Sequence, residues 1–569
     1  MIHRPTALTP LIVAAGILVL AACAPSPASS PAAETVAPSS RFGGTLKIAW
    51  AVEPNTLAPK FIGGSGSPEY QWLFSSTLTF LTIGSALQPM LAEDIPMQST
   101  GSWVINPDGS MVTTYRLRQN AKWHDGTPLT AQDFVFAFDV YVDKDLPVIR
   151  RSPENLMARV EALDDSTLVI RWKETYAGAN SLGFEQLLPL PRHVLEGKYR
   201  SNDPTFVSGP EWTTAYISTG PFKVDRWTPG VGIVAAANGD FVLGPPKLDS
   251  IDIRFVLDSS AQLANLLSGE VDMINSTGAK FEDALVARDR WRESGEGYIK
   301  TFSSQAPYIE WQFREVPNWQ RAIADVRVRQ ALLHAIDLET LNETLNRGLT
   351  PVAHAFVSPE DPLFSDVVRV VTKYSFDRAR AATLLDEAGW RQPAGGGMVA
   401  NLEGKLLDVE QATTPSQERA STIIADNWKA AGVNSSFFVV PQAQARDAES
   451  STNFVATRAS SRFLGPDQFA WSAMDFPTPE NRWTGVNTGS FFDAEVDRLH
   501  NLRLTSLDDD QRRQATISLM KRMTEVVAPM PVLYSVEFIV ARRYVLGPVG
   551  RVSGQNGLTW NVHEWALTP

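Results

Sequence analysis

A single cysteine, Cys23, is present in the 569 residues of this chain. One thiol cannot form an intramolecular disulfide, and zinc sites built from several thiolates are excluded as well. The folded chain must therefore be held together by buried apolar side chains. Because 569 residues exceed what one hydrophobic core usually serves, we expect two or three lobes, each with a core of its own.

The composition indicates a folded chain that does not bind nucleic acid. Apolar residues make up 44% of the sequence and charged residues 20%, which is ordinary for a globular protein. The formal net charge of −12 repels phosphate backbones, so we expect no nucleic-acid partner. We interpret the mild acidity as an aid to solubility.

The position of Cys23 predicts export and lipidation. Arg4 precedes an apolar run over residues 11–22, and this run is shorter than the roughly 20 residues that a membrane span needs. A basic start, a short apolar core and small residues before a cleavage site are typical of a signal peptide, here residues 1–22. The segment Leu20-Ala21-Ala22-Cys23 resembles the bacterial lipobox, whose cysteine is acylated and becomes the new N-terminus. The alternative is a plain signal peptide with an incidental cysteine.

Residues 23–41 are predicted to form the lipidated cysteine and a flexible tether. Nearly all of them after Cys23 are Ala, Pro, Ser, Thr, Val or Glu, a composition that cannot bury a core. No later segment reaches transmembrane length. We therefore expect the mature protein at the cell membrane, anchored by lipid on its extracytoplasmic (periplasmic or outer) face.

Local patterns in the remaining chain predict alternating strands and helices. Residues 131–142 carry apolar side chains at helical spacing behind Thr130, a predicted N-cap. Further helices are predicted over 325–345, 377–388, 420–431 and 509–527, and strands over 45–50, 113–118, 167–172 and 251–256. Because strands and helices alternate without a repeat, we predict α/β or α+β lobes with mixed sheets.

Three segments together resemble one protein family. They are Trp123–Asp133 with the following Phe134-Val135-Phe136, Asp325–Asp337, and Ala379–Trp390. In this order, and behind a lipobox, they are similar to signature segments of the extracytoplasmic solute-binding proteins of the oligopeptide, dipeptide and nickel type. These proteins, family 5 of the bacterial solute-binding proteins, are receptors of ABC importers. The resemblance covers about residues 42–545.

The resemblance implies a periplasmic-binding-protein-like α/β (mixed α+β) fold with hinged lobes, mixed sheets and an inserted extra lobe. Lobe I is expected to be discontinuous and to comprise residues 42–85, 215–300 and 541–569. Lobe II is expected over 86–214 and lobe III over 301–540. The ligand is expected between lobes I and III, where closure of the hinge would bury it.

The signature residues themselves have a structural interpretation. Asp125-Gly126 is expected to form a tight turn, and Thr130 to cap the helix that follows. Arg327 and Arg329 are expected to pair with carboxylates around a helix start. These residues identify the family without marking its pocket.

Three regions are predicted to contact the ligand. The loop after the first strand offers Glu53 and Asn55, at what resembles the lobe I edge of the cleft. The extended segment 305–311 offers Tyr308 and Trp311, and its backbone can pair with a peptide strand. The third region, 462–483, offers two acids and two aromatic side chains: Asp467, Asp475, Trp471 and Trp483.

Each of these predictions has an alternative. In oligopeptide-binding members of the family an aspartate in the third region grips the amino terminus of the ligand. Asp467 and Asp475 are the candidates here, and neither sits in a clear copy of that motif, so peptide specificity stays open. The acids can equally be solvated loop residues, and Trp471 and Trp483 can be core residues instead of pocket walls.

No catalytic, metal-binding or cofactor-binding motif is apparent in the sequence. His-x-x-x-His and Gly-x-Ser-x-Gly are absent, and Gly395-Gly396-Gly397 lacks the lysine of a phosphate-binding loop. We therefore predict a monomeric receptor, not an enzyme, that captures oligopeptide-like or other small solutes and delivers them to an ABC permease. The alternatives are the same fold binding an oligosaccharide, a metal chelate or haem, an adhesion or signalling lipoprotein and, more remotely, an exported hydrolase.

Overall fold

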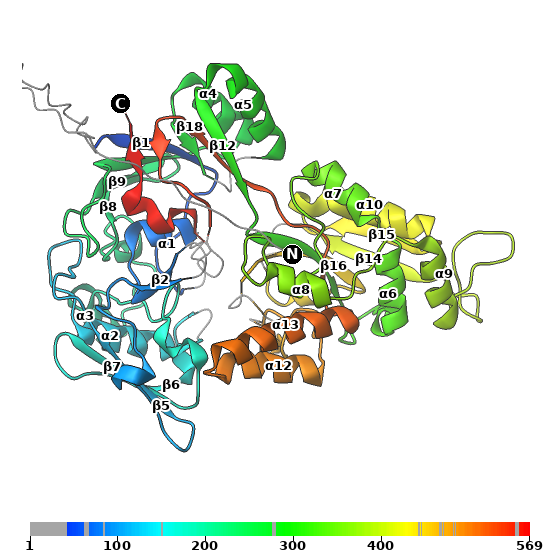
Figure 1. Ribbon diagram of the computed structural model, residues 1–569, viewed down its shortest axis with the longest axis horizontal. Helices are drawn as coiled ribbons and strands as arrows, with labels where there is room; N and C mark the ends of the chain where they lie inside the picture. Colours follow the sequence, from blue (N-terminus) through cyan, green and yellow to red (C-terminus); the bar gives the residue numbers. More distant parts are fainter. Residues whose placement is uncertain are drawn as a thin grey trace, which may run out of the picture. The chain divides into compact units, whose positions relative to one another are not determined.

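The structure is a computed structural model of the whole chain (Figure 1). It describes residues 43–61, 68–82, 86–148, 152–275, 280–441, 444, 447–465, 469, 471–481, 483, 485–551 and 557–568. The predicted signal peptide, Cys23 and the tether lie outside these residues. All described residues fall in one compact unit, so the division into three lobes stays a prediction. Within this part of the chain, no helix combines the length and apolar character needed to cross a membrane.

A seven-stranded mixed sheet gathers segments from both ends of the chain. Its strand order is β12-β18-β11-β1-β10-β9-β8, and β1 runs parallel to both β10 and β11. The strands are β1 (Thr45–Trp50), β8 (Phe222–Thr228), β9 (Gly232–Ala237), β10 (Ser250–Phe255), β11 (Met273–Ile274), β12 (Gly297–Phe302) and β18 (Glu537–Arg542). The predicted strand over 45–50 is confirmed as β1. β18 straddles the boundary expected between lobe III, which ends at residue 540, and the last part of lobe I, which begins at residue 541.

Both faces of this sheet are buried. Helices α4 (Ser259–Ser268) and α5 (Phe281–Ser294) cover one face, where Leu266 and Trp291 pack with Val540. On the other face Ile48 and Ile253 pack with residues of α1 (Pro68–Phe74). A buried sheet of this kind is a rigid support for the loops at its strand ends.

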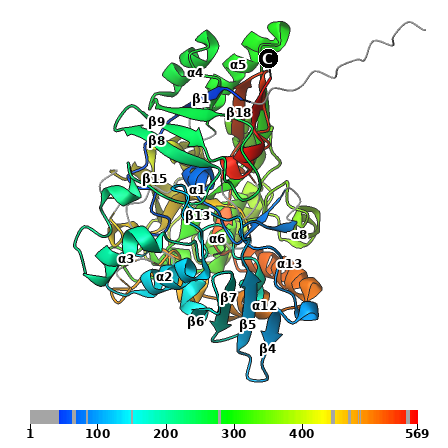
Figure 2. The same cartoon turned by 90° about the vertical axis from the view of Figure 1, so that its left-hand side faces the viewer.

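A four-stranded antiparallel sheet follows in the order β4-β5-β7-β6 (Figure 2). Its strands are β4 (Trp103–Ile105), β5 (Met111–Arg116), β6 (Met157–Ala162) and β7 (Thr167–Trp172). The associated helices are α2 (Ala131–Val142), with the predicted bounds, and α3 (Arg192–Arg200). At the start of α2 the Asp133 carboxylate accepts from the backbone N–H of Thr130 at 2.9 Å. Thr130 is the N-cap residue of α2, as expected, and it forms a capping box with Asp133.

A five-stranded mixed sheet comes from the second half of the chain, in the order β15-β14-β16-β13-β17. Its strands are β13 (Gln305–Trp311), β14 (Asp408–Thr413), β15 (Asn434–Val439), β16 (Thr457–Phe463) and β17 (Met530–Pro531). In Figure 1, β14 and β15 lie among α6 (Val326–His334), α7 (Leu338–Asn346), α9 (Arg378–Glu387) and α10 (Glu418–Ala430). Trp428 and Leu384 of these helices share a core with Ile309 of β13. A second core lies with α8 (Phe364–Val370), α12 (Ala494–Thr505) and α13 (Asp509–Glu525), where Val367 packs with Leu499 and Leu519.

One predicted helix was wrong in its continuity. The expected helix over 325–345 is divided into α6 and α7, because Asp337 has non-helical dihedrals and its carboxylate caps α7 by accepting from Thr340 N. The interpretation of the adjacent arginines holds for one of them. Arg327 pairs with the Asp325 carboxylate, whereas Arg329 donates to four backbone carbonyls: those of Ile323, Ala324, Val526 and Val527.

The remaining elements are short. Two small antiparallel pairs are β2 (Thr79–Leu81) with β3 (Leu87–Pro89) and β19 (Val545–Leu546) with β20 (Ala566–Leu567). The 3₁₀ turns are η1 (Gln98–Thr100), η2 (Glu154–Leu156), η3 (Ala177–Asn180), η4 (Pro210–Trp212), η5 (Arg321–Ala324), η6 (Pro415–Gln417), η7 (Ser450–Thr452), η9 (Ala473–Asp475) and η10 (Leu558–Glu564).

Candidate ligand-binding site

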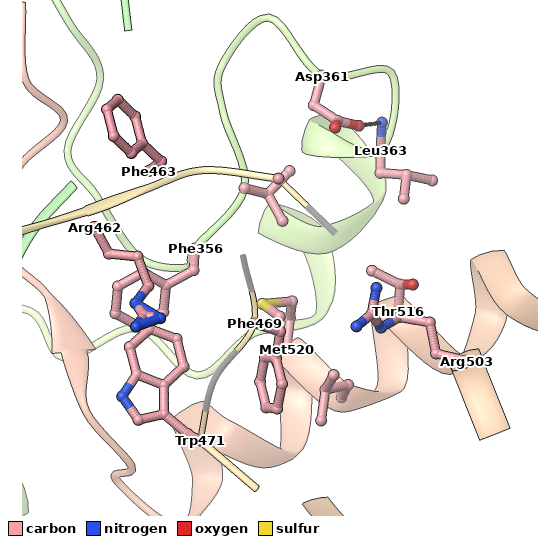
Figure 3. A pocket seen from close by; sticks show the side chains of 13 residues that line it. Phe356, Asp361, Leu363, Arg462, Phe463, Phe469, Trp471, Arg503, Thr516 and Met520 are labelled. Carbon is pink, nitrogen blue, oxygen red and sulfur yellow. Dashed lines mark hydrogen bonds between the residues drawn. The ribbon is translucent and has the colours of Figure 1, made fainter. Parts of the chain in front are cut away.

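An aromatic pocket lies beside the end of β16 (Figure 3). Its empty volume is about 500 Å³, part of which is open to solvent. We call it the aromatic pocket and define it by its lining residues, Phe356, Val357, Asp361, Leu363, Arg462, Phe463, Gly465, Phe469, Trp471, Arg503, Thr516, Leu519 and Met520. An apolar, aromatic lining with a few charged groups is typical of a site for a small organic ligand or an amino-acid side chain.

Four separate segments build the aromatic pocket. The antiparallel register of β13 and β16 sets Phe463 opposite Gln305 and so delivers the end of β16 to the pocket. The chain ahead of α8 supplies Phe356 and Asp361, and the Asp361 carboxylate accepts from Leu363 N at 2.8 Å, which fixes this turn. Helices α12 and α13 supply the floor through Arg503 and Met520, together with Thr516 and Leu519.

Trp471 is a tightly packed wall of the pocket. Only 1% of this residue is exposed, and its ring centroid lies 4.3 Å from that of Phe356 and 5.7 Å from that of Phe469. The Arg462 guanidinium lies 5.1 Å from the same ring, close enough for a cation–π interaction. Tyr308 of β13 supports Trp471 edge-on at 5.5 Å. The indole is therefore held in one orientation before any ligand arrives.

Burial shifts the pKa values of two titratable groups near the pocket, His500 and Asp475. His500 packs on Phe469 with ring centroids 4.6 Å apart, and burial together with the neighbouring Arg503 lowers its pKa to about 3. This imidazole is therefore neutral at physiological pH. Burial raises the pKa of Asp475, while a hydrogen bond from the Ser472 hydroxyl at 2.9 Å and the Arg462 charge oppose the shift. The lining itself carries the guanidinium groups of Arg462 and Arg503 and the Asp361 carboxylate, and it is otherwise mostly apolar.

The predicted residues of the third region divide into several environments. Trp471 lines the pocket, and Asp475 lies on η9 four residues further along. Trp483 packs under the Arg314 guanidinium at 5.1 Å and has a positive φ of 61°. Asp467 lies outside the described residues.

The two predicted aromatics of β13 point to opposite faces of the strand pair. Tyr308 packs against Trp471 behind the pocket, and burial raises its pKa to about 12. Trp311 is fully buried in the core of the five-stranded sheet, and its indole N–H donates to Ala528 O at 3.0 Å. Its side chain is therefore occupied by core packing.

Glu53 and Asn55 lie in the loop after β1, as expected. The Glu53 carboxylate accepts from the Trp227 indole N–H at 2.8 Å and from Gly230 N at 2.9 Å. These bonds tie the loop to the turn between β8 and β9. Asn55 is exposed in the same loop. Whether either residue contacts a ligand stays a prediction.

Several lining residues were not among the predicted contacts. Phe356, Phe469 and Met520 are apolar and occur in patterns that a core would also produce, so no sequence signal distinguishes them. Arg503 is 7% exposed, and this burial is a property of the tertiary structure that the sequence does not display. Among the residues that the structure describes, no group of three or more His, Cys, Asp or Glu side chains is placed to hold a metal ion.

Comparison with known proteins gives a consistent family assignment. The family model described as bacterial extracellular solute-binding proteins, family 5 Middle, matches residues 86–477. The oligopeptide-binding protein AppA of Bacillus subtilis is 25% identical over 454 residues, 76% of each chain. Heme-binding protein A of Haemophilus influenzae is 26% identical over 579 residues, covering 95% of this chain and 97% of its own.

Solved structures show the same fold. AppA from Bacillus subtilis in complex with a nonapeptide superposes with a TM-score of 0.71 at 22% identity, covering 93% of this chain and 100% of AppA. NikZ from Campylobacter jejuni in complex with Ni(L-His) superposes with a TM-score of 0.74 at 22% identity, covering 92% of this chain and 99% of NikZ. The predicted periplasmic-binding-protein-like fold with mixed sheets is therefore confirmed.

Proposed function

This chain belongs to family 5 of the bacterial extracellular solute-binding proteins, and from that premise we propose that it captures oligopeptide-like solutes for an ABC importer. The match spans more than half of the chain and includes the segments that carry Phe356, Arg462 and Trp471. The proposed receptor works outside the cytoplasm and passes its ligand, chemically intact, to a membrane permease.

The aromatic pocket is the observation that carries this proposal. A peptide bound beside the end of β16 would place an apolar or aromatic side chain against Trp471, Phe356 and Phe469. Rigid aromatic walls supply large contact area at little cost in conformational entropy, and such residues dominate binding energy at interfaces. The relatives named for oligopeptide or peptide binding support the same ligand class.

Further contacts are proposed from outside the pocket. Asp475 and Asp467 remain the candidates for the ligand's amino terminus, and Glu53 and Asn55 the candidates on the opposite side of the proposed cleft. Closure of lobes I and III around the ligand is part of the proposal, as is a monomeric state. Cys23 is the proposed site of lipid attachment, with residues 1–22 as signal peptide and 23–41 as tether.

Haem or a metal chelate is the second candidate ligand class. The relative named heme-binding protein A is similar over 95% of this chain, a larger share than the 76% of the oligopeptide-binding relative. The fold is also shared with NikZ, solved with Ni(L-His). An apolar, aromatic pocket suits the face of a porphyrin as well as it suits a side chain.

A binding experiment separates these candidates. The purified protein is incubated with a pool of random-sequence pentapeptides, with hemin, or with Ni²⁺ and histidine, and its melting temperature is measured, since a ligand that binds only the folded state raises it. We expect a rise with the peptides alone and the recovery of uncleaved peptides by mass spectrometry. A rise with hemin accompanied by a shifted Soret band would support the second candidate, and cleaved peptides would contradict the receptor function.

A further inference from the structure

The chain passes between the seven-stranded and five-stranded sheets at two adjacent places in the described residues. One crossing joins β12 to β13 through Ser303 and Ser304, and the other joins β17 to β18 over residues 532–536. The second crossing is bonded to β13, which begins directly after the first crossing, because Ser535 N donates to Gln305 O at 2.9 Å and Val532 N donates to Pro307 O at 2.9 Å. A change in the angle between the sheets would have to be accommodated here.

A buried charge cluster lies at this pair of crossings. Glu537, the first residue of β18, accepts a hydrogen bond from the Ser304 hydroxyl of the first crossing. Its second carboxylate oxygen lies 3.1 Å from Nε of Arg551, and Nη2 of Arg551 lies 2.6 Å from the Glu69 carboxylate on α1. The Arg551 and Glu69 side chains are 1% exposed and that of Glu537 is 9% exposed.

Arg551 also contacts the aromatic pocket. Its guanidinium lies 5.2 Å from the ring centroid of Phe463, which is the last residue of β16 and lines the pocket. The segment that carries Arg551 is fixed along β12, because Lys300 Nζ donates to Pro548 O at 2.9 Å. The Arg551 side chain therefore contacts the wall of the pocket, α1 and the start of β18 directly, and it reaches Ser304 of the first crossing through Glu537.

The chemistry of arginine suits a link of this kind. The planar guanidinium offers several donors in fixed directions and can stack on an aromatic face at the same time, whereas a lysine offers one point charge. A buried guanidinium between two carboxylates tolerates few alternative geometries, because removing the guanidinium would leave two buried carboxylates without a compensating positive charge. A displacement of Phe463 is thus opposed by, and transmitted to, Glu537 and Ser304.

We propose that Arg551 is a positioning residue that couples occupancy of the aromatic pocket to the arrangement of the two crossings. A ligand side chain in the pocket fixes Phe463, Phe463 fixes the guanidinium, and the guanidinium fixes the start of β18. This inference rests on the proposed receptor function for its ligand-bound half, while the coupling in the unliganded protein does not depend on the identity of the ligand.

The test measures the two sheets relative to each other with and without ligand. In the full chain, Cys23→Ser removes the only thiol, and Arg288→Cys on α5 with Arg380→Cys on α9 provides two exposed sites for spin labels. Distances between the labels are measured by pulsed electron paramagnetic resonance, and affinity for the pentapeptide pool is measured by titration calorimetry. Arg551→Met and Arg551→Lys are compared with the parent protein.

The matched control is Lys60→Met. Lys60 and Glu154 form an equally buried ion pair at 2.6 Å, with side chains 1% and 0% exposed, away from the residues that line the pocket. We expect this control to lower the melting temperature without changing the distance distribution or the affinity. A purely structural role for Arg551 would give the same pattern.

We expect Arg551→Met to broaden the unliganded distance distribution and to weaken peptide affinity by about tenfold, which corresponds to about 1.4 kcal/mol. Arg551→Lys should restore part of both effects. Distributions and affinities equal to those of the parent would overturn the proposal. If Arg551→Met does not fold, Arg551→Lys and Phe463→Leu carry the unliganded test. Failure of the parent itself to bind peptides would reject the proposed ligand class, while the unliganded distances would still decide the coupling.

Discussion

The rings of Trp471 and Phe356 lie 4.3 Å apart between centroids, although 114 intervening residues separate them in the sequence. Phe356 comes from the chain ahead of α8 and Trp471 from the chain after β16. Their contact closes one side of the aromatic pocket (Figure 3) and defines the surface that a ligand side chain would meet.

Replacing Trp471 is expected to lower peptide affinity as well as the melting temperature. Trp471→Phe keeps an aromatic wall but shortens it, so affinity for the pentapeptide pool should fall by about tenfold in titration calorimetry. Trp311→Phe is the matched control, because Trp311 is a buried core indole that does not line the pocket. Both variants should lose melting temperature, and equal affinities in the two would remove Trp471 from the site.

The two arginines of the segment 325–331 are expected to contribute very differently to stability. Arg329 is 5% exposed and donates to four backbone carbonyls, so Arg329→Met should lower the free energy of unfolding by about 3–5 kcal/mol. Arg327 is 45% exposed in its ion pair with Asp325, so Arg327→Met should change the free energy of unfolding far less than Arg329→Met does. Urea denaturation measures both, and similar losses would contradict the assignment.

Stability is expected to fall as the pH drops below about 6.5. Burial lowers the pKa of His124 to about 4 and that of His500 to about 3, so both are neutral in the folded protein where the unfolded chain already binds protons. Stability from each group is complete above its unfolded pKa of about 6.5 and is lost as the pH falls toward the folded value. The slope per group reaches about 1.4 kcal/mol per pH unit.

The measurement compares the parent protein with His500→Gln. Glutamine keeps an acceptor for Arg503, whose Nη2 lies 3.2 Å from the His500 ring nitrogen, but it does not titrate. Between pH 4 and 6 the variant should take up about one proton fewer on unfolding than the parent, so its free energy of unfolding should depend less steeply on pH. Parallel curves for the two proteins would show that His500 does not contribute.

Lipid attachment at Cys23 is expected to decide where the protein partitions. In detergent phase separation, the chain expressed in a bacterium with a lipoprotein pathway should enter the detergent phase, because acyl chains add about 0.8 kcal/mol of membrane affinity for each buried CH₂ group. Cys23→Ser should move it to the aqueous phase without changing peptide affinity. Equal partitioning of the two chains would contradict lipidation.

Much of the secondary structure could be predicted because it depends on neighbours in the sequence. The capped helix over 131–142 and the strand over 167–172 have the predicted bounds, since hydrophobic period and capping residues act within a few positions. The helix expected over 325–345 failed for a local reason that the pattern also contained: Asp337 caps a new helix there.

The candidate site was only partly predictable. Trp471 was expected to contact the ligand and lines the pocket, but Trp311, on the strand that also carries Tyr308, faces a core. The sequence does not distinguish a tryptophan that lines a pocket from one that fills a core. Which face of β13 contacts Trp471 depends on the pairing of β13 with β16 and on the elements that cover each face. Neither can be inferred from the residues of β13 alone.

The sequence by itself determined the family, the mixed fold and the absence of an intramolecular disulfide, because motifs, local periodicity and a single cysteine can all be seen in the order of the residues. Only the tertiary structure decided which aromatic side chains form the pocket and that Arg551 joins Phe463 to Glu537 and Glu69. These contacts join residues from distant parts of the chain, and burial of one side chain by another becomes defined only when the sheets and helices have packed.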